Sequence, residues 1–130
     1  MYTPGGWGYV GGFTYTTTMP ISGTDEDVLY QSERWWNGMG TYKFTVANGV
    51  YNVELRFAEI YSYAHRGGRV FDIRIEGALV RSNVDIVATA GMYHAYDVSV
   101  TGVVVTDGVL QIDLAPRKGS PKINAIRISP

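Results

Sequence analysis

The sequence predicts an all-β fold, a β-sandwich formed by a single domain. Short segments with an apolar residue at every second position recur along the chain, and turn-forming pairs such as Asn48-Gly49 and Asp107-Gly108 separate them. No segment of about ten or more residues has a convincing helical period. The length of 130 residues suits one domain, and it is long enough to bury a core without metal or disulfide support.

Composition excludes several classes of function. The chain has no cysteine, which excludes thiol catalysis, disulfides and thiolate metal sites, and its net charge of -1 provides no basic surface for nucleic acid. No apolar run approaches the roughly 20 residues of a membrane helix, and segment 1–6 lacks the features of a signal peptide. We therefore expect neither a nucleic-acid nor a membrane partner. Aromatic residues make up 13% of the chain and charged residues only 18%, which favours a surface that exposes some rings.

The first part of the chain predicts loops rather than regular strands. Residues 1–27 are rich in glycine, threonine and tyrosine, a composition typical of irregular structure. The segment 28–32 reads as a short strand, and segment 33–38 (E-R-W-W-N-G) as a charged and aromatic corner. We expect the rings of this region to lie in or beside loops.

The next two segments predict a β-hairpin. Residues 41–47 and 51–57 both alternate, and Asn48-Gly49 between them accepts the positive φ angles of a two-residue turn. This turn would place Phe44 beside Val53 on the inner face and Lys43 beside Glu54 on the outer face. Pattern and turn chemistry agree on this register.

The second half of the chain predicts further strands. Residues 69–77 alternate with Ile73 and Ile75 inward, and segment 96–106 changes phase at Thr101-Gly102, which indicates a β-bulge. Asp107-Gly108 predicts a second tight hairpin that pairs Val105 with Leu110. The remaining segments are a turn at 77–78, a strand at 79–81, a short apolar run at 84–87, a loop at 88–94, a loop at 117–121 and a last strand at 123–128 with a phase change near Ala125.

The aromatic residues divide into two groups. Inward strand positions predict core rings at Tyr42, Tyr51, Phe57 and Phe71, whereas no strand face claims Phe13, Tyr15, Trp35, Trp36, Tyr61 and Tyr63. A sugar ring presents a patch of C–H groups flanked by hydroxyls, so its site needs an apolar plate with polar groups at the rim. Each loop ring suits the role of a loop anchor as well as that of a ligand plate, but several together at one end of a sandwich favour sugar binding.

Enzyme and metal readings have less support. His65 and His94 are isolated, and no catalytic motif is present. Paired carboxylates for glycoside hydrolysis could come from Glu33, Glu59 and Asp72, although solvated or salt-bridged acids are the commoner case. The triplet 25–27 (D-E-D) matches no calcium loop, so we expect no metal site and no cofactor.

Glu59 is the acid that we expect on an inward face. Continuing the alternation of segment 51–57 places its side chain inside, where a carboxylate needs a partner. Arg34 and Arg69 are the candidate partners. A structural ion pair that braces the loop bases is the favoured role for this group, with direct ligand contact as the alternative.

Three segments resemble the malectin and malectin-like domain family. Residues 27–35 (D-V-L-Y-Q-S-E-R-W) are similar to the family's D-x-L-Y-Q-[ST]-E-R-[YW] motif. Residues 53–61 (V-E-L-R-F-A-E-I-Y) with 69–73 (R-V-F-D-I) resemble its second signature, and residues 121–126 (P-K-I-N-A-I) resemble its closing strand. The segments occur in the family's order. The resemblance implies a jelly-roll β-sandwich of the galactose-binding-like type that binds carbohydrate without catalysis.

The resemblance also implies candidate site residues. The family's ligand aromatics fall on Trp35 and Tyr61, and another falls near Phe13 or Tyr15. A further aromatic position is occupied by Ser62, with Tyr63 as its substitute. The family's acidic residue falls near Gly119, next to Ser120, so we expect this hydrogen-bond acceptor to be absent. The candidate sugar-binding residues are Phe13, Tyr15, Trp35, Trp36, Tyr61, Ser62, Tyr63 and Ser120. The family's opening strand has no counterpart, so we expect that the chain begins after it.

Three hypotheses follow for function. The first is a non-catalytic module that binds a glucan or related oligosaccharide and is tethered to a glycoside hydrolase, in an extracellular or periplasmic location. The second is a protein-interaction or assembly domain on the same fold, in which the exposed rings form a flat hot spot. The third is an enzyme, whose glycoside turnover would vanish in Glu59→Gln.

Overall fold

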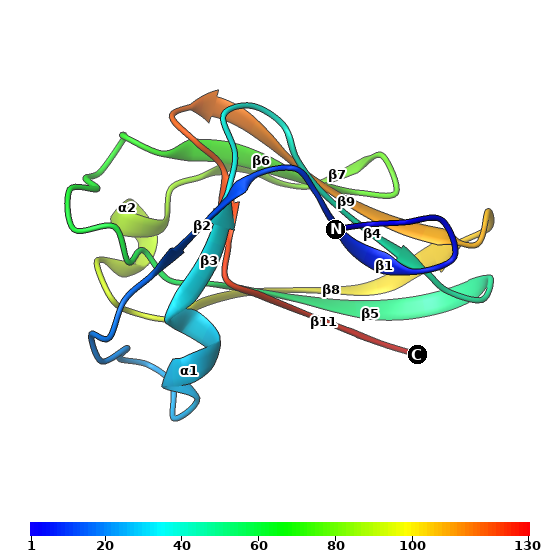
Figure 1. Ribbon diagram of the computed structural model, residues 1–130, viewed down its shortest axis with the longest axis horizontal. Coiled ribbons are helices and arrows are strands. Elements are labelled where there is room, and N and C mark those ends of the chain that lie inside the picture. Colours follow the sequence, from blue (N-terminus) through cyan, green and yellow to red (C-terminus); the bar gives the residue numbers. More distant parts are fainter.

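The computed structural model describes residues 1–130 and contains two antiparallel sheets packed face to face (Figure 1). The larger sheet has the strand order β1-β4-β9-β6-β7, and the sheet opposite it has the order β11-β5-β8. A small sheet, β10-β3-β2, stands beside them. The strands are β1 (Trp7–Val10), β2 (Phe13–Thr16), β3 (Ser32–Trp35), β4 (Gly40–Thr45), β5 (Gly49–Phe57), β6 (Val70–Ile75), β7 (Ala78–Val84), β8 (Tyr96–Val105), β9 (Val109–Lys118), β10 (Lys122–Ile123) and β11 (Ala125–Ser129). The predicted all-β sandwich is confirmed.

Alternate side chains of the two facing sheets form the core. The sequence pattern placed one face of β5 and one face of β6 inside, and these side chains expose at most 2% of their surface: Val53, Leu55, Phe57, Phe71, Ile73 and Ile75. Each fully buried apolar side chain of this size stabilises the fold by about 1.5–3 kcal/mol. The predicted inward faces of β5 and β6 are therefore confirmed. In a strand, successive side chains point to opposite faces, so alternation of apolar and polar residues shows which face is buried.

The predicted hairpin between segments 41–47 and 51–57 is wrong. β4 pairs with β9, with Phe44 opposite Leu110, whereas β5 pairs with β8 and β11 in the other sheet. The chain at Asn48-Gly49 therefore crosses from one sheet to the other as an arch. Alternation shows that β4 and β5 each have one apolar face. These two faces lie opposite each other across the core, and the strands are not neighbours in one sheet.

The predicted hairpin at Asp107-Gly108 is wrong for the same reason. This turn joins β8 to β9, which lie in opposite sheets, so Val105 does not pair with Leu110. The two arches support each other: Val46 N donates to Gly108 O at 3.0 Å, and Gly108 N donates to Asn48 Oδ1 at 2.8 Å. Two turn sequences thus form one end of the sandwich, on the right in Figure 1.

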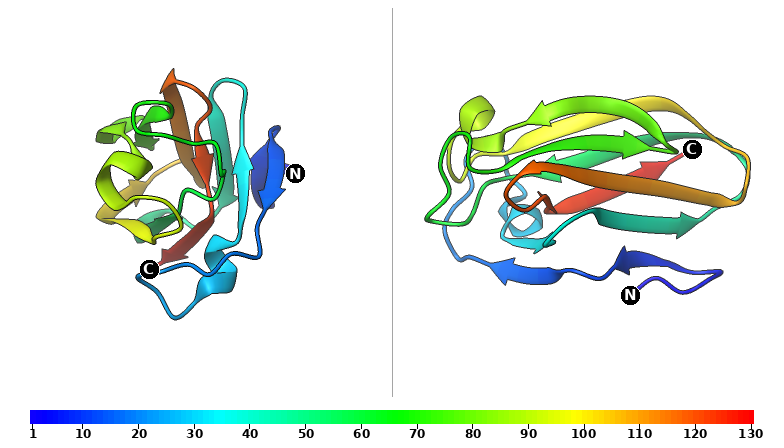
Figure 2. Two further views of the ribbon diagram at one scale, coloured as in Figure 1. Left: turned by 90° about the vertical axis from the view of Figure 1, so that its left-hand side faces the viewer. Right: turned by 90° about the horizontal axis from the view of Figure 1, so that it is seen from above.

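The glycine-rich segment 1–27 is more regular than predicted, because it contains strands β1 and β2. These strands run end to end along one edge of the molecule (Figure 2). Gly11 and Gly12 have φ angles of 67° and 90°, a backbone shape that disfavours other residues. The glycine pair lets the chain leave the large sheet after β1 and enter the small sheet as β2.

Two short helices replace predicted strand and loop structure. The segment predicted as a strand at 28–32 contains helix α1 (Asp27–Tyr30), and β3 begins only at Ser32. Helix α2 (Ile86–Ala90) lies in the region predicted as an apolar run and a loop, and the Asp85 carboxylate caps it by accepting from Ala88 N at 3.1 Å. Helices this short are stabilised by caps and packing and leave no periodic signal in a sequence.

Two irregularities in the strand pattern are confirmed. Between the pairs Tyr51–Val103 and Val53–Val100, β8 has one more residue than β5, which is the predicted bulge at Thr101-Gly102. The phase change near Ala125 corresponds to Asn124, which separates β10 from β11. In both places the chain keeps its apolar side chains inward after a local slip.

Candidate binding site

The small sheet forms the floor of the candidate site. In the antiparallel pair β2–β3, Phe13 lies opposite Trp35 and Tyr15 lies opposite Glu33, so the four side chains share one face. The same face continues to Lys122 on β10, which lies opposite Trp35. Two segments that are far apart in sequence thereby place aromatic, acidic and basic side chains side by side.

The segment after β5 forms the opposite wall. Ala58 and Ile60 are buried, and Ala58 N donates to Asn124 Oδ1 at 3.0 Å. Tyr61 is the first residue to emerge, with 42% of its surface exposed, and its carbonyl closes a turn by accepting from Ala64 N at 2.9 Å. The ring therefore projects from an anchored segment and not from a loose loop tip.

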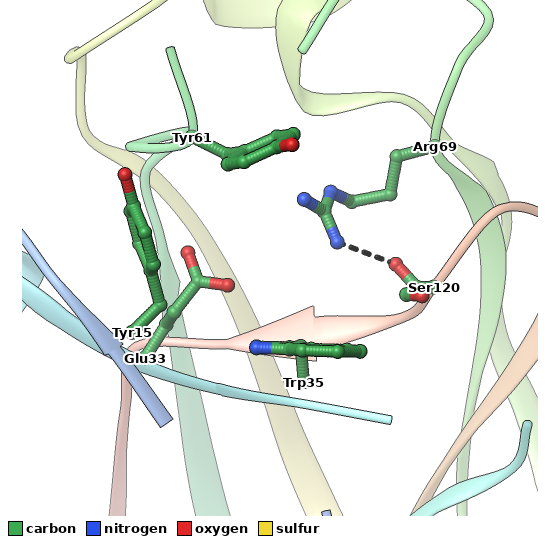
Figure 3. Close-up of a pocket in the computed structure, with 6 residues that line it drawn as sticks. All are labelled: Tyr15, Glu33, Trp35, Tyr61, Arg69 and Ser120. Atoms are coloured by element: carbon green, nitrogen blue, oxygen red, sulfur yellow. Dashed lines mark hydrogen bonds between the residues drawn. The ribbon is translucent and has the colours of Figure 1, made fainter. Parts of the chain in front are cut away.

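Between floor and wall lies a hollow of about 290 Å³. Its lining residues are Tyr15, Glu33, Trp35, Tyr61, Arg69 and Ser120. Figure 3 shows Trp35 and Tyr61 on opposite sides of this hollow, with the Glu33 carboxylate and the Arg69 guanidinium directed into the space between them. The arrangement offers two apolar plates with hydrogen-bonding groups at their edges. We call this space the inner hollow.

A buried ion pair supports the wall. Arg69 Nε donates to Glu59 Oε2 at 2.7 Å and Arg69 Nη2 to Glu59 Oε1 at 3.3 Å, and the Glu59 side chain is completely buried. Arg69 Nη1 also donates to the Ser120 carbonyl at 2.6 Å. These bonds join the end of β5, the start of β6 and the loop before β10, so the inner hollow is held from three directions.

Arg34, the other partner considered for Glu59, does not join this pair. Arg34 Nη1 donates to Gly11 O at 3.0 Å, and its guanidinium lies 3.3 Å from the centre of the Tyr9 ring. Because it alternates with Glu33 and Trp35 on β3, Arg34 faces the opposite side of the small sheet. The expectation that it braces Glu59 is therefore corrected.

A second buried ion pair lies beneath the inner hollow and was not predicted. Lys122 Nζ donates to Glu33 Oε1 at 2.8 Å and also to the Ala58 carbonyl, and the lysine is fully buried. Burial lowers the pKa of Lys122, and the neighbouring Glu33 carboxylate opposes this shift. The signal that could have revealed the pair is Lys122 itself, a cation that directly precedes the inward-facing Ile123 in the closing segment.

Comparison with known proteins identifies the family. The malectin domain model matches residues 3–127. The chain belongs to the malectin domain family. Malectin-B of Xenopus laevis is 36% identical over 86 residues, which are 64% of this chain and 31% of that protein. The chain thus spans about a third of the length of this curated relative.

Solved structures show where malectin-like folds occur. A β-glucuronidase of Bacteroides uniformis matches with a TM-score of 0.88 and 26% identity, over 98% of this chain and 14% of that chain. The extracellular domain of ANXUR1 from Arabidopsis thaliana matches with a TM-score of 0.78 and 17% identity, over 94% of this chain and 39% of that chain. The second likeness shows the fold alone. The first places a similar domain inside a much larger enzyme.

Within this malectin domain, Trp36 is not available to a ligand. It exposes 4% of its surface, and its indole Nε1 donates to Val10 O at 2.9 Å. A Cβ added at Gly12 would lie 2.7 Å from Trp36 Nε1, and one added at Gly40 would lie 2.4 Å from the ring. Trp36 is therefore a core residue packed against two glycines, which corrects its inclusion among the candidate site residues.

The other candidates fall in and around the inner hollow. Tyr15, Trp35, Tyr61 and Ser120 line it. Phe13 stacks on Trp35 with ring centres 4.8 Å apart and supports that plate from outside the hollow. Ser62 is exposed and lines no hollow near the site, whereas Tyr63 is 80% exposed and packs edge-on against Tyr61.

Each of the three acids considered for catalysis has an ion-pair partner, which is Lys122 for Glu33. Glu33 lines the inner hollow, Glu59 is sealed in its pair with Arg69, and Asp72 binds Arg117 on β9 at 2.8 Å. In the acidic triplet 25–27, Asp27 Oδ2 accepts from Ile21 N at 3.0 Å, and nowhere do three or more His, Cys, Asp or Glu side chains gather in a metal-binding arrangement. The malectin domain also contains no helix with the length and hydropathy to span a membrane.

Proposed function

We propose that this domain is a non-catalytic module that binds a glucan or related oligosaccharide in the inner hollow. The observation that carries the proposal is the placement of Trp35 and Tyr61 on opposite sides of one recessed space (Figure 3). An aromatic ring on either side matches the apolar faces of a pyranose ring, which stacks on such plates. The hollow lies near the lower end of the roughly 300–1,000 Å³ typical of small-molecule sites, a size suited to a sugar unit.

Polar groups support the choice of a neutral sugar. The Glu33 carboxylate uses Oε1 to bind Lys122, which leaves Oε2 to accept bonds from sugar hydroxyls. Arg69 is neutralised by Glu59, so the inner hollow contains paired charges of both signs and no excess positive charge to favour an anionic sugar. Hydroxyl groups both donate and accept, and they suit such a lining.

The recessed shape favours sugar binding over the protein-interaction alternative, because a protein hot spot would be a flatter surface with aromatic anchors. A neighbouring catalytic domain would raise the avidity of a weak sugar module, because binding and catalysis would then act on one polymer. The match to part of the Bacteroides uniformis β-glucuronidase supports such a tether to a glycoside hydrolase. An extracellular or periplasmic location accords with a polysaccharide ligand.

Glycan-array screening followed by calorimetry with glucans and galactosides tests the proposal. We expect Trp35→Ala and Tyr61→Ala each to weaken sugar binding by about tenfold or more, because an aromatic plate contributes on the order of 1 kcal/mol beyond its buried area. Trp7→Ala is the matched control. The Trp7 side chain is also aromatic, exposes 70% of its surface and does not line the inner hollow.

Binding to no sugar by the folded wild-type domain would reject the proposal. If self-association were lost in the Trp35 and Tyr61 variants at the same time, the protein-interaction function would take its place. Glycoside turnover by the folded wild-type domain would instead identify an enzyme.

A further inference from the structure

At three places in the chain an asparagine or aspartate is followed directly by glycine: Asn37-Gly38, Asn48-Gly49 and Asp107-Gly108. In such a pair the backbone nitrogen of the glycine can attack the side-chain carbonyl carbon, because glycine has no side chain to obstruct the approach. The attack closes a succinimide ring. The two Asn-Gly pairs are alike in sequence, so their surroundings decide which of them reacts.

The pairs in the two arches protect each other. Asn48 Oδ1 accepts a hydrogen bond from Gly108 N at 2.8 Å, so one bond holds the side-chain amide of the first pair and the backbone nitrogen of the other. Gly49 belongs to β5, which pairs with β8, and Asp107 Oδ1 accepts from Val109 N at 3.2 Å. Ring closure at either pair therefore requires this end of the sandwich to open locally.

The pair Asn37-Gly38 has no such restraint. Asn37 is exposed, and neither its side-chain amide nor Gly38 N forms a hydrogen bond with another group of the protein. A Cβ added at Gly38 would meet no atom within 4 Å, so the space beside this glycine is open. The Asn37 amide can therefore turn towards Gly38 N without breaking a contact.

The residues on either side of this pair are fixed. Trp36 is held in the core, where its indole donates to Val10 O at 2.9 Å, and Gly40 begins β4. The free part of the connection between β3 and β4 is therefore residues 37–39. A chemical change at Asn37 is confined to this short connection, outside the packed core.

We propose that Asn37 is a site of spontaneous covalent modification, while the two arches slow the same reaction at Asn48. In the first step hydroxide removes the proton of Gly38 N, and this nitrogen forms a bond to Asn37 Cγ. The bond from Cγ to the amide nitrogen breaks, and ammonia leaves after taking up a proton from water.

In the second step water opens the succinimide ring at either of its two carbonyl carbons. The product is aspartate or isoaspartate at position 37. No group is oxidised or reduced, and water is the co-reactant. The modification adds one negative charge to a domain with a net charge of -1. It does not depend on what the inner hollow binds.

Peptide mapping by mass spectrometry of the whole domain tests this assignment. The folded protein is incubated in mildly alkaline buffer and digested with trypsin, which places Asn37 in peptide 35–43 and Asn48 in peptide 44–56. We expect Asn37 to react about tenfold or more faster, because reaction at Asn48 first requires its hydrogen bond and the pairing of β5 to open. A sample digested without incubation gives the background.

Incubation in urea is the control for local sequence. Both Asn-Gly pairs are then free of tertiary contacts, and their rates should agree within about threefold. Asn37→Gln should abolish the fast reaction, because ring closure from the longer side chain is slower. Asn37→Asp reproduces the charge of the product, and its Tm should stay within about 3 °C of the wild-type value.

The outcomes separate the parts of the assignment. Reaction at Asn37 that yields both aspartate and isoaspartate, and that exceeds reaction at Asn48 in the folded domain alone, would support it. Equal rates at the two asparagines in the folded domain would overturn it. A difference that persists unchanged in urea would reject the protection by the arches, and a product with aspartate but no isoaspartate would reject the succinimide step.

Discussion

Lys122 and Glu33 form an ion pair with an Nζ to Oε1 distance of 2.8 Å, and their side chains expose 0% and 2% of their surface. The pair connects β10 to β3 directly beneath the inner hollow. Removing one partner of a buried ion pair is strongly destabilising, because the other charge is then left buried without a partner.

Removal of Lys122 should be far more destabilising than removal of an exposed cation. We expect Lys122→Met to lower the free energy of unfolding by about 3–5 kcal/mol, since Glu33 would remain buried and unpaired. The matched control is Lys118→Met, because Lys118 is exposed and forms no ion pair, and we expect a loss below about 1 kcal/mol.

Urea denaturation of both variants checks this difference. The double variant Glu33→Gln, Lys122→Met should recover part of the loss, because it no longer leaves a bare charge. Equal losses for Lys122→Met and Lys118→Met would contradict the prediction.

Asn124 connects three elements around the binding site. Its amide accepts from Ala58 N at 3.0 Å and donates to the carbonyls of Tyr30 at 2.9 Å and Ser32 at 3.1 Å. Asn124→Ala should lower the free energy of unfolding by about 2 kcal/mol or more, because three backbone groups lose their partner. The exposed Asn37→Ala should change it by less than about 0.5 kcal/mol. Chemical denaturation measures both, and an effect at Asn124 as small as that at Asn37 would show that water replaces the amide.

Two glycines should respond differently to the same added methyl group. At Gly40, the Cβ would lie 2.4 Å from the Trp36 ring inside the core, and we expect a loss of about 3 kcal/mol or more from overpacking. At Gly102 in the β8 bulge, the Cβ would meet no atom within 4 Å, and the φ angle of 71° alone should cost about 1–2 kcal/mol. Thermal melts of Gly40→Ala and Gly102→Ala give the comparison. A smaller loss at Gly40 would place Trp36 outside the packed core.

Asp72 should contribute to stability only above acidic pH. The hydrogen bond from Arg117, followed by that from Asn83 N, holds the pKa of the Asp72 carboxyl below its ordinary value of 3.8. Because the folded protein favours the ionised form, this contribution is present above about pH 3.8 and is lost as pH falls through the lower pKa of the folded state. In thermal melts, the difference in Tm between wild type and Asp72→Asn should therefore narrow as the pH falls from 7 to 3. A constant difference in Tm across this range would assign the effect to packing instead of charge.

Local sequence accounts for the strands of the two facing sheets from β4 onward, for the buried faces of β5 and β6, and for the family. Val53, Leu55 and Phe57 are inward because alternation is a property of the extended chain itself, and the bulge at Gly102 is visible as a break in that alternation. The motif at 27–35 carries the family resemblance in a single short segment. The buried faces, the bulge and the motif each depend on residues that are neighbours along the chain, so the sequence alone predicts them.

Contacts between segments distant in the sequence determine the strand pairing and the side chains that reach the binding site. Asn48-Gly49 permits a tight reversal, but the place of β4 beside β9 depends on a strand more than half the chain away. Trp35 and Trp36 are adjacent and chemically alike, yet successive side chains of an extended segment point to opposite sides, so one lines the inner hollow and the other packs against Gly40. Lys122 finds Glu33 only after β10 pairs with β3. The burial of each of these side chains depends on segments that are distant in the sequence and cover it in the fold. Tertiary packing therefore determines which rings and charges reach the site.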